Sequence, residues 1–159
     1  MKMKDVCEVV KQAGMNQVSS VLASGNILFQ TDENKAELRK RLELALTKWY
    51  QEEVSLLVFD EMELKSLLAA VPFASNDAVH LYVFLCEAGF ETTLEALFQA
   101  QSKGPLEEAM ISQGFFFWQV AKQETLHTEF SKVLGKKAYK TKFTSRNLNT
   151  IHKIVSKMQ

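Results

Sequence analysis

The chain has 159 residues, with 19 basic and 19 acidic side chains and a hydrophobic content of 47%. A chain of this length forms one ordinary domain or two small ones and buries enough surface to fold without disulfide or metal crosslinks. Its hydrophobic content excludes a disordered protein, and no apolar stretch reaches the roughly 18 residues of a membrane-spanning helix.

The first predicted elements are a helix and a hairpin. Residues 4–13 carry valines at helical spacing, and Gly14 after them is a helix-stop signal. Two short apolar runs, 17–23 and 27–31, flank the turn Ser24-Gly25-Asn26. Short apolar runs around a Gly-Asn turn are typical of a hairpin, so we expect two antiparallel strands here.

Three more elements are predicted before residue 73. Asn34 and Glu37 form a capping-box pattern, which indicates the start of a helix. Residues 54–59 form an apolar run typical of a strand. A further helix starts after Asp60, and Pro72 ends it.

The second half is predicted to start with the strand Val79–Cys86, whose apolar residues on both faces indicate a central position. A capping-box pattern at Thr92 predicts a helix. Residues 106–112 and 115–120 form a second hairpin across Gln113-Gly114. Two helices are predicted to end the chain, the first with the apolar stripe Leu126, Phe130, Val133 and Leu134 and the second with Leu148, Ile151, Val155 and Met158.

The order of these elements predicts an α+β fold with two ferredoxin-like halves and mainly antiparallel sheets. We expect an N-terminal half over residues 1–72, which lacks its opening strand. The C-terminal half covers residues 73–159 and ends in a basic helical tail.

Four segments resemble the motifs of one family. Residues 18–29 match a hairpin with Ser-Gly-Asn at its turn, and Val71-Pro72-Phe73 matches a helix-ending Asn-Pro-Phe with valine in place of asparagine. Ser131-Lys132 fits a Ser-Lys pair, and residues 143–154 resemble an ending Thr-Thr-Arg-Asn-x-Asn-Thr-x-x-Lys. In this order, over nearly the whole chain, they resemble the uncharacterised domain-of-unknown-function family 1697.

The resemblance implies a difference at the start of the chain. Members of that family usually begin with a strand and a Gly-rich loop, whereas this sequence starts at Met1-Lys2-Met3, about where the loop ends. Without the opening strand, two strand edges lose their partner. Three alternatives would account for the missing opening strand: the sequence is truncated, the sheet is rearranged, or another chain supplies the strand.

Positive charge is concentrated at the end of the sequence. From Thr128 onward, eight basic side chains stand against Glu129 alone, which gives this segment a net charge of +7 and the rest −7. Such a segment is typical of a polyanion-binding tail, or it complements the acidic body on folding. Residues 136–143 combine four lysines with aromatic side chains, the combination that binds single-stranded nucleic acid. The alternative is a solvated connector between elements.

A predicted helix start is the main candidate for anion binding. With Thr144 or Ser145 as N-cap, Arg146 and Asn147 would lie in the first helical turn, where free N–H groups attract anions. Asn149 and Lys153 would share one helix face. The alternative is a capped helix that Arg146 ties to the neighbouring sheet or loop.

Two further places complete the predicted ligand-binding residues. The hairpin tip Ser24, Gly25 and Asn26 presents amides that suit an anion, although the same residues also serve ordinary turn chemistry. Lys132, in the Ser-Lys pair of the basic segment, is the last of them.

No motif indicates catalysis, a cofactor or a metal. The histidines His80, His127 and His152 lack metal-ligand spacing. The adjacent acidic residues Glu107 and Glu108 would point to opposite faces of a strand, which suits solvent better than acid–base chemistry. The run Phe115–Trp118 would alternate faces too, so at least half of it is expected in the core rather than in a base-stacking surface.

These patterns predict a binding module for an anionic ligand, either a nucleotide or a nucleic acid, that uses the basic C-terminal helices. The alternatives are a protein-interaction or assembly module that forms a homodimer through open sheet edges, and an enzyme of unidentified reaction. Two cysteines without a disulfide spacing, and a start interrupted by Asp5 and Glu8, predict a cytoplasmic location without membrane contact.

Overall fold

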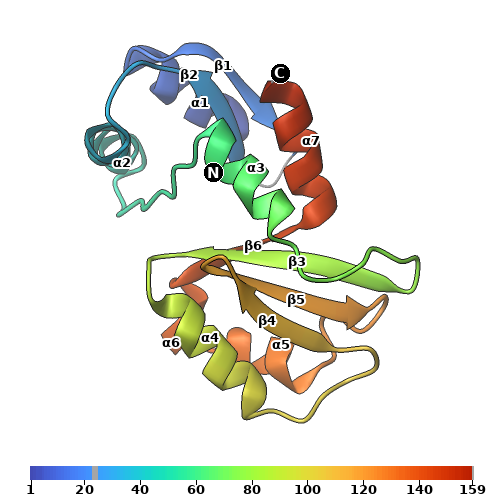
Figure 1. Cartoon of the computed structure of the whole chain (residues 1–159). Coiled ribbons are helices and arrows are strands. Elements are labelled where there is room, and N and C mark those ends of the chain that lie inside the picture. Colours follow the sequence, from blue (N-terminus) through green and yellow to red (C-terminus); the bar gives the residue numbers. More distant parts are fainter. Residues whose placement is uncertain (23–24, 159) are drawn as a thin grey trace. The chain divides into compact units, whose positions relative to one another are not determined.

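The computed structural model describes residues 1–22 and 25–158 and has an α+β fold with antiparallel sheets. The chain forms two compact units (Figure 1): the first comprises Met1–Asp60 with the last residues from Ser156, and the second comprises Glu61–Val155. The predicted division between residues 72 and 73 places the helix over residues 61–69 in the N-terminal half, whereas here it belongs to the second unit. That the two predicted halves are separate domains stays a prediction.

The first unit contains two helices and one hairpin. Helix α1 (Met3–Gln12) precedes strands β1 (Asn16–Val21) and β2 (Asn26–Gln30), and helix α2 (Lys35–Tyr50) follows. The strands pair antiparallel, which confirms the predicted hairpin. The helices and the hairpin enclose a core of buried side chains: Val6, Val9, Val10, Met15, Leu38, Leu42 and Leu46.

The predicted strand over residues 54–59 is wrong, because this segment has no regular secondary structure and pairs with none of the strands described. Side chains of α2 bind its backbone instead: the Val54 N–H donates to Thr47 Oγ1 at 3.0 Å, and the Leu56 N–H donates to Glu43 Oε1 at 2.7 Å. In a ferredoxin-like sheet the neighbour of this strand is the opening strand, and the described residues contain no strand before α1.

The second unit contains a four-stranded antiparallel sheet in the order β4-β5-β3-β6. Its central elements run strand, helix, strand, strand, helix, strand, which is the ferredoxin-like order. The elements are α3 (Glu61–Ala69), β3 (Val79–Cys86), α4 (Phe90–Gln99), β4 (Glu108–Ser112), β5 (Phe115–Ala121), α5 (Glu129–Leu134), α6 (Lys137–Lys140), β6 (Phe143–Asn147) and α7 (Leu148–Met158). Helices α4 and α5 lie on one face of this sheet, and α3 and α7 lie on the other (Figure 1). Within the described residues, no helix is long and apolar enough to cross a membrane.

Strand β6 corrects the prediction of a helix that starts near Thr144. The segment pairs with β3, with Phe143 opposite Cys86 and Asn147 opposite Tyr82, and helix α7 begins only at Leu148. The ring of Phe143 stacks on Phe84 with 5.1 Å between centroids. Burial of this ring against the core favours the extended conformation over a helical turn.

The helix starts agree only partly with the capping patterns. Asn34 is confirmed as the N-cap of α2, since its side chain accepts from the N–H groups of the first turn at 2.9 and 3.4 Å. The start at Thr92 is wrong: α4 begins at Phe90, and the Thr92 hydroxyl donates to the Gly89 carbonyl at 2.7 Å. Thr128 caps α5, a role the sequence did not indicate.

Aromatic side chains form the core between the sheet and helices α4 and α5. Phe116, Phe117 and Trp118 are all buried, which confirms that most of this run belongs to the core. Phe116 and Trp118 join Phe84 and Phe130 in one cluster. Strand alternation places Phe117 on the opposite face of the sheet.

Candidate functional site

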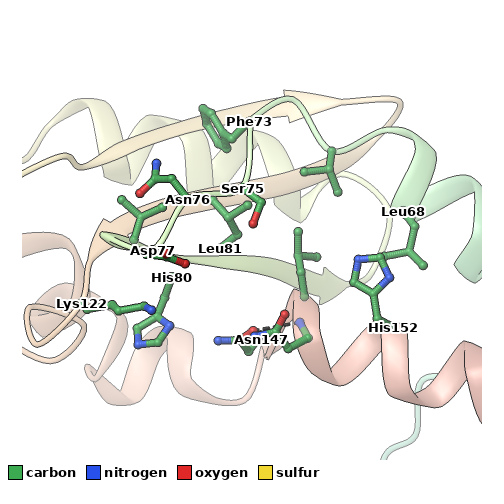
Figure 2. Close-up of a pocket in the computed structure, with 14 residues that line it drawn as sticks. Leu68, Phe73, Ser75, Asn76, Asp77, His80, Leu81, Lys122, Asn147 and His152 are labelled. Atoms are coloured by element: carbon green, nitrogen blue, oxygen red, sulfur yellow. Dashed lines mark hydrogen bonds between the residues drawn. The ribbon is translucent and has the colours of Figure 1, made fainter.

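A pocket of about 350 Å³ lies in the second unit, at the start of β3 (Figure 2). Four segments line it: the end of α3 with the loop that follows, the first residues of β3, the turn at Lys122, and the junction of β6 with α7. All of them belong to the second unit. Because they come from residues 68–152, only the folded sheet brings them together.

The two ends of the pocket differ in chemistry. Figure 2 shows Leu68 and His152 at one end, and Asn76, His80 and Lys122 at the other. The second end therefore carries an amide, an imidazole, an ammonium group and, at Asp77, a carboxylate, whereas Leu68 makes the first end the less polar of the two. We refer to them as the apolar end and the polar end.

Two asparagines at the pocket are oriented by backbone hydrogen bonds. The Ala78 N–H donates to Asn76 Oδ1 at 2.8 Å, and the Asn149 N–H donates to Asn147 Oδ1 at 2.9 Å. Each bond occupies the amide oxygen and leaves the amide nitrogen as the end that can donate. Both side chains therefore offer hydrogen-bond donors, which suit an acidic ligand.

A backbone bond also fixes the charged residue at the polar end. The Lys122 N–H donates to the Ala78 carbonyl at 3.0 Å, which holds the start of the lysine side chain beside β3. Asp77 is the one carboxylate among the residues that line the pocket. Lys122 and Asp77 carry opposite charges, so the amide donors are what favours an oxyanion over a cation here.

Of the residues predicted for ligand binding, the pocket contains Asn147 and Asn149. Lys132 is exposed on α5 and forms an ion pair with Glu129 at 3.2 Å. Lys153 is exposed on α7 and does not line the pocket. The two predicted asparagines thus both line the pocket, whereas these two lysines do not.

Arg146 does not lie at a helix start, contrary to the prediction. It is in β6 opposite Val83, and its Nη1 donates to Thr144 Oγ1 at 2.5 Å and to the Ser145 carbonyl at 2.9 Å. Adjacent strand residues face opposite sides, so Arg146 points away from Asn147. The guanidinium is half-buried, and this burial lowers its pKa below the ordinary value.

The predicted hairpin tip belongs to the first unit and takes no part in the pocket. Gly25 has a φ of +84°, which glycine adopts without strain, and Asn26 Nδ2 donates to the Val21 carbonyl at 3.2 Å. Ser24 lies outside the described residues. The contacts of Gly25 and Asn26 are those of ordinary turn chemistry.

Six polar residues of the pocket were missed from the sequence: Ser75, Asn76, Asp77, His80, Lys122 and His152. An Asn-Asp pair before a strand is a turn signal, which could have indicated Asn76 but not a ligand site. Nothing in the sequence indicates that His80 and His152 line one pocket. Across residues 1–22 and 25–158, no three histidine, cysteine or acidic side chains gather closely enough to hold a metal ion.

The thiol of Cys86 is expected to react slowly. Burial raises its pKa to about 11, and the negative charges of Glu91 and Glu87 add to the rise. The thiolate is the reactive form, so at pH 8 only about one thiol in a thousand is available. In a Cys7→Ser variant, iodoacetamide labelling followed by mass spectrometry should accelerate about tenfold per pH unit from pH 8 to 10. Labelling in urea is the control, and a native rate at pH 8 equal to the rate in urea contradicts this prediction.

Comparison with known proteins shows the fold and the family. The chain is similar in structure to the conserved bacterial protein SP0830 from Streptococcus pneumoniae, with a TM-score of 0.79 and 23% sequence identity, over 98% of this chain and 88% of that chain. At this identity the likeness shows the fold alone. No curated protein matches the chain. Residues 1–117 match the family described as "Protein of unknown function (DUF1697)", and the chain therefore belongs to this family, as its hairpin and helix-end motifs predicted.

Proposed function

We propose that this chain is a binding module for a small anionic ligand of the nucleotide class, and that the pocket of the second unit is its binding site. One observation carries the proposal: a single pocket is lined by Lys122 and by Asn76 and Asn147, whose amide oxygens accept backbone N–H groups. A cation and two neutral donors match the acceptor oxygens of a phosphate. The proposal keeps the predicted class of ligand, and it assigns the positive charge of the binding site to Lys122 instead of Arg146.

Loss of the Lys122 charge tests this proposal. Lys122→Ala should weaken binding of adenosine 5′-monophosphate (AMP) by about 10- to 100-fold, because a hydrogen bond from a charged group contributes about 1.5–3 kcal/mol. Isothermal titration calorimetry measures the change. Lys157→Ala, at an exposed position of α7 outside the pocket, is the matched control and should bind AMP as the unaltered chain does. Equal affinities of Lys122→Ala and the unaltered chain would refute the proposal.

A nucleic acid would use a different surface. Lys136, Lys137, Lys140 and Lys142 are exposed and do not line the pocket. A strand held by these lysines would dissociate steeply as salt rises, because each neutralised phosphate releases counterions. We favour the nucleotide because four segments of the second unit line one pocket of about 350 Å³, and none of these lysines belongs to it.

Two further parts of the predicted function stay proposals. Assembly through sheet edges is supported by the edge strands β4 and β6 and by the unpaired segment 54–59, and light scattering across protein concentrations would detect it. A cytoplasmic location is supported by the free thiols of Cys7 and Cys86, which fit a reducing compartment.

A further inference from the structure

We propose that the pocket recognises an organic phosphate monoester of the size of a mononucleotide, and that it discriminates against inorganic phosphate. In this arrangement the phosphate lies at the polar end, and the organic group lies at the apolar end. The inference rests on the proposed function, which requires only that an anion binds. It adds the organic group of the ligand and the orientation of the ligand in the pocket.

The polar end is suited to the phosphate. Asn76 and Asn147 come from separate elements, the loop before β3 and the end of β6, and the amide oxygen of each accepts a backbone N–H. Lys122 supplies a positive charge from a third element, the turn after β5. Donors from three separate elements can contact different oxygens of one phosphate.

The apolar end needs an organic group. Leu68, Val71 and Leu148 line the pocket from α3, from the residues after α3, and from the first residue of α7. Leu148 is already buried, but an inorganic phosphate at the polar end would leave the half-buried Leu68 and Val71 partly in water. A ring that covers them gains the free energy of apolar burial, and the imidazole of His152 offers a polar group at the same end.

The size of the pocket limits the organic group. A volume of about 350 Å³ is at the small end of the roughly 300–1,000 Å³ that small-molecule sites occupy. This volume favours one base and one sugar over a dinucleotide or a polymer. Asp77, the carboxylate of the lining, opposes additional negative charge, which favours a monophosphate over a triphosphate.

Three probes separate the two halves of the ligand: AMP, inorganic phosphate and adenosine, each titrated by calorimetry at constant ionic strength. AMP is expected to bind at least 10-fold more tightly than either of the others. Val71→Thr keeps the side-chain shape and should weaken AMP binding severalfold, while it leaves binding of inorganic phosphate unchanged. Lys122→Ala should weaken both. Thermal melting of each variant verifies that it is folded.

The outcomes distinguish this inference from the proposed function. If AMP and inorganic phosphate bind equally, the organic half is refuted while anion binding stands. If adenosine binds as tightly as AMP, the assignment of the phosphate to the polar end is refuted. If none of the three probes binds, both the inference and the proposed function fail.

Discussion

Replacing Phe130 by alanine is expected to lower the free energy of unfolding of the second unit by about 3–5 kcal/mol, the range for removal of a fully buried phenylalanine. Phe130 is 0% exposed and belongs to the core under the sheet. Its ring lies 5.2–6.1 Å, between centroids, from four other aromatic rings, those of Phe84, Phe98, Phe116 and Trp118. Alanine would leave a cavity that these rigid rings cannot fill by small movements.

Urea denaturation, followed by circular dichroism, measures this loss. The control is Leu126→Ala, since Leu126 is 81% exposed and its removal should change the free energy of unfolding by less than about 0.5 kcal/mol. A loss below 1 kcal/mol for Phe130→Ala would show that the aromatic core is not packed as described.

The second large effect is expected at Glu107, whose carboxylate is buried with 7% of the residue exposed. Glu107 Oε2 accepts from Trp118 Nε1 at 2.8 Å, and Oε1 accepts from the Gly104 N–H at 2.8 Å. Glu107→Ala removes both acceptors and leaves two donors without them. We expect a loss of about 3 kcal/mol or more, because each hydrogen bond to a charged group contributes about 1.5–3 kcal/mol.

Two variants separate the hydrogen bonds from the rest of the side chain. Glu107→Gln keeps one acceptor oxygen and nearly the same volume, so its loss should be about half as large. Glu108→Ala, at the exposed neighbouring position, should stay within about 0.5 kcal/mol of the unaltered chain. Chemical denaturation, monitored by tryptophan fluorescence, compares all three variants. Equal losses for Glu107→Gln and Glu107→Ala would contradict the role given to the second acceptor.

Glu107 also shows where sequence reasoning ends. Adjacent carboxylates suggested solvent exposure, and this is correct for Glu108 but wrong for Glu107. The donors that make burial possible belong to Gly104 and to Trp118, and Trp118 comes close only when β4 pairs with β5. Local patterns therefore predict the hairpin but not the buried carboxylate within it.

The same distinction applies to the strands. The hairpin across Gln113-Gly114 was predictable, because apolar runs flank a turn that contains glycine. In the structure the runs pair, and both turn residues adopt positive φ. Strand β6 was not, because its conformation depends on pairing with β3, some sixty residues earlier in the chain. The segment 54–59 has the composition of a strand and yet stays unpaired, since composition does not supply a neighbour.

The candidate site was predictable only in part, for the same reason. Asn147 and Asn149 stood out as polar residues at the predicted start of the last helix, and both line the pocket. Lys122 lies in the turn after β5, and His80 lies inside strand β3, so neither position carries a local sequence signal for a site. Their convergence with the asparagines follows from the strand order, which no short motif encodes.

The bonds between α2 and the segment 54–59 have a consequence for aggregation. The N–H groups of Val54 and Leu56 both donate to side chains of α2, so one edge of the segment is turned toward Thr47 and Glu43. While α2 holds the segment in this way, that edge is closed to a further strand. The two bonds therefore remove one edge through which exposed strands of different molecules pair.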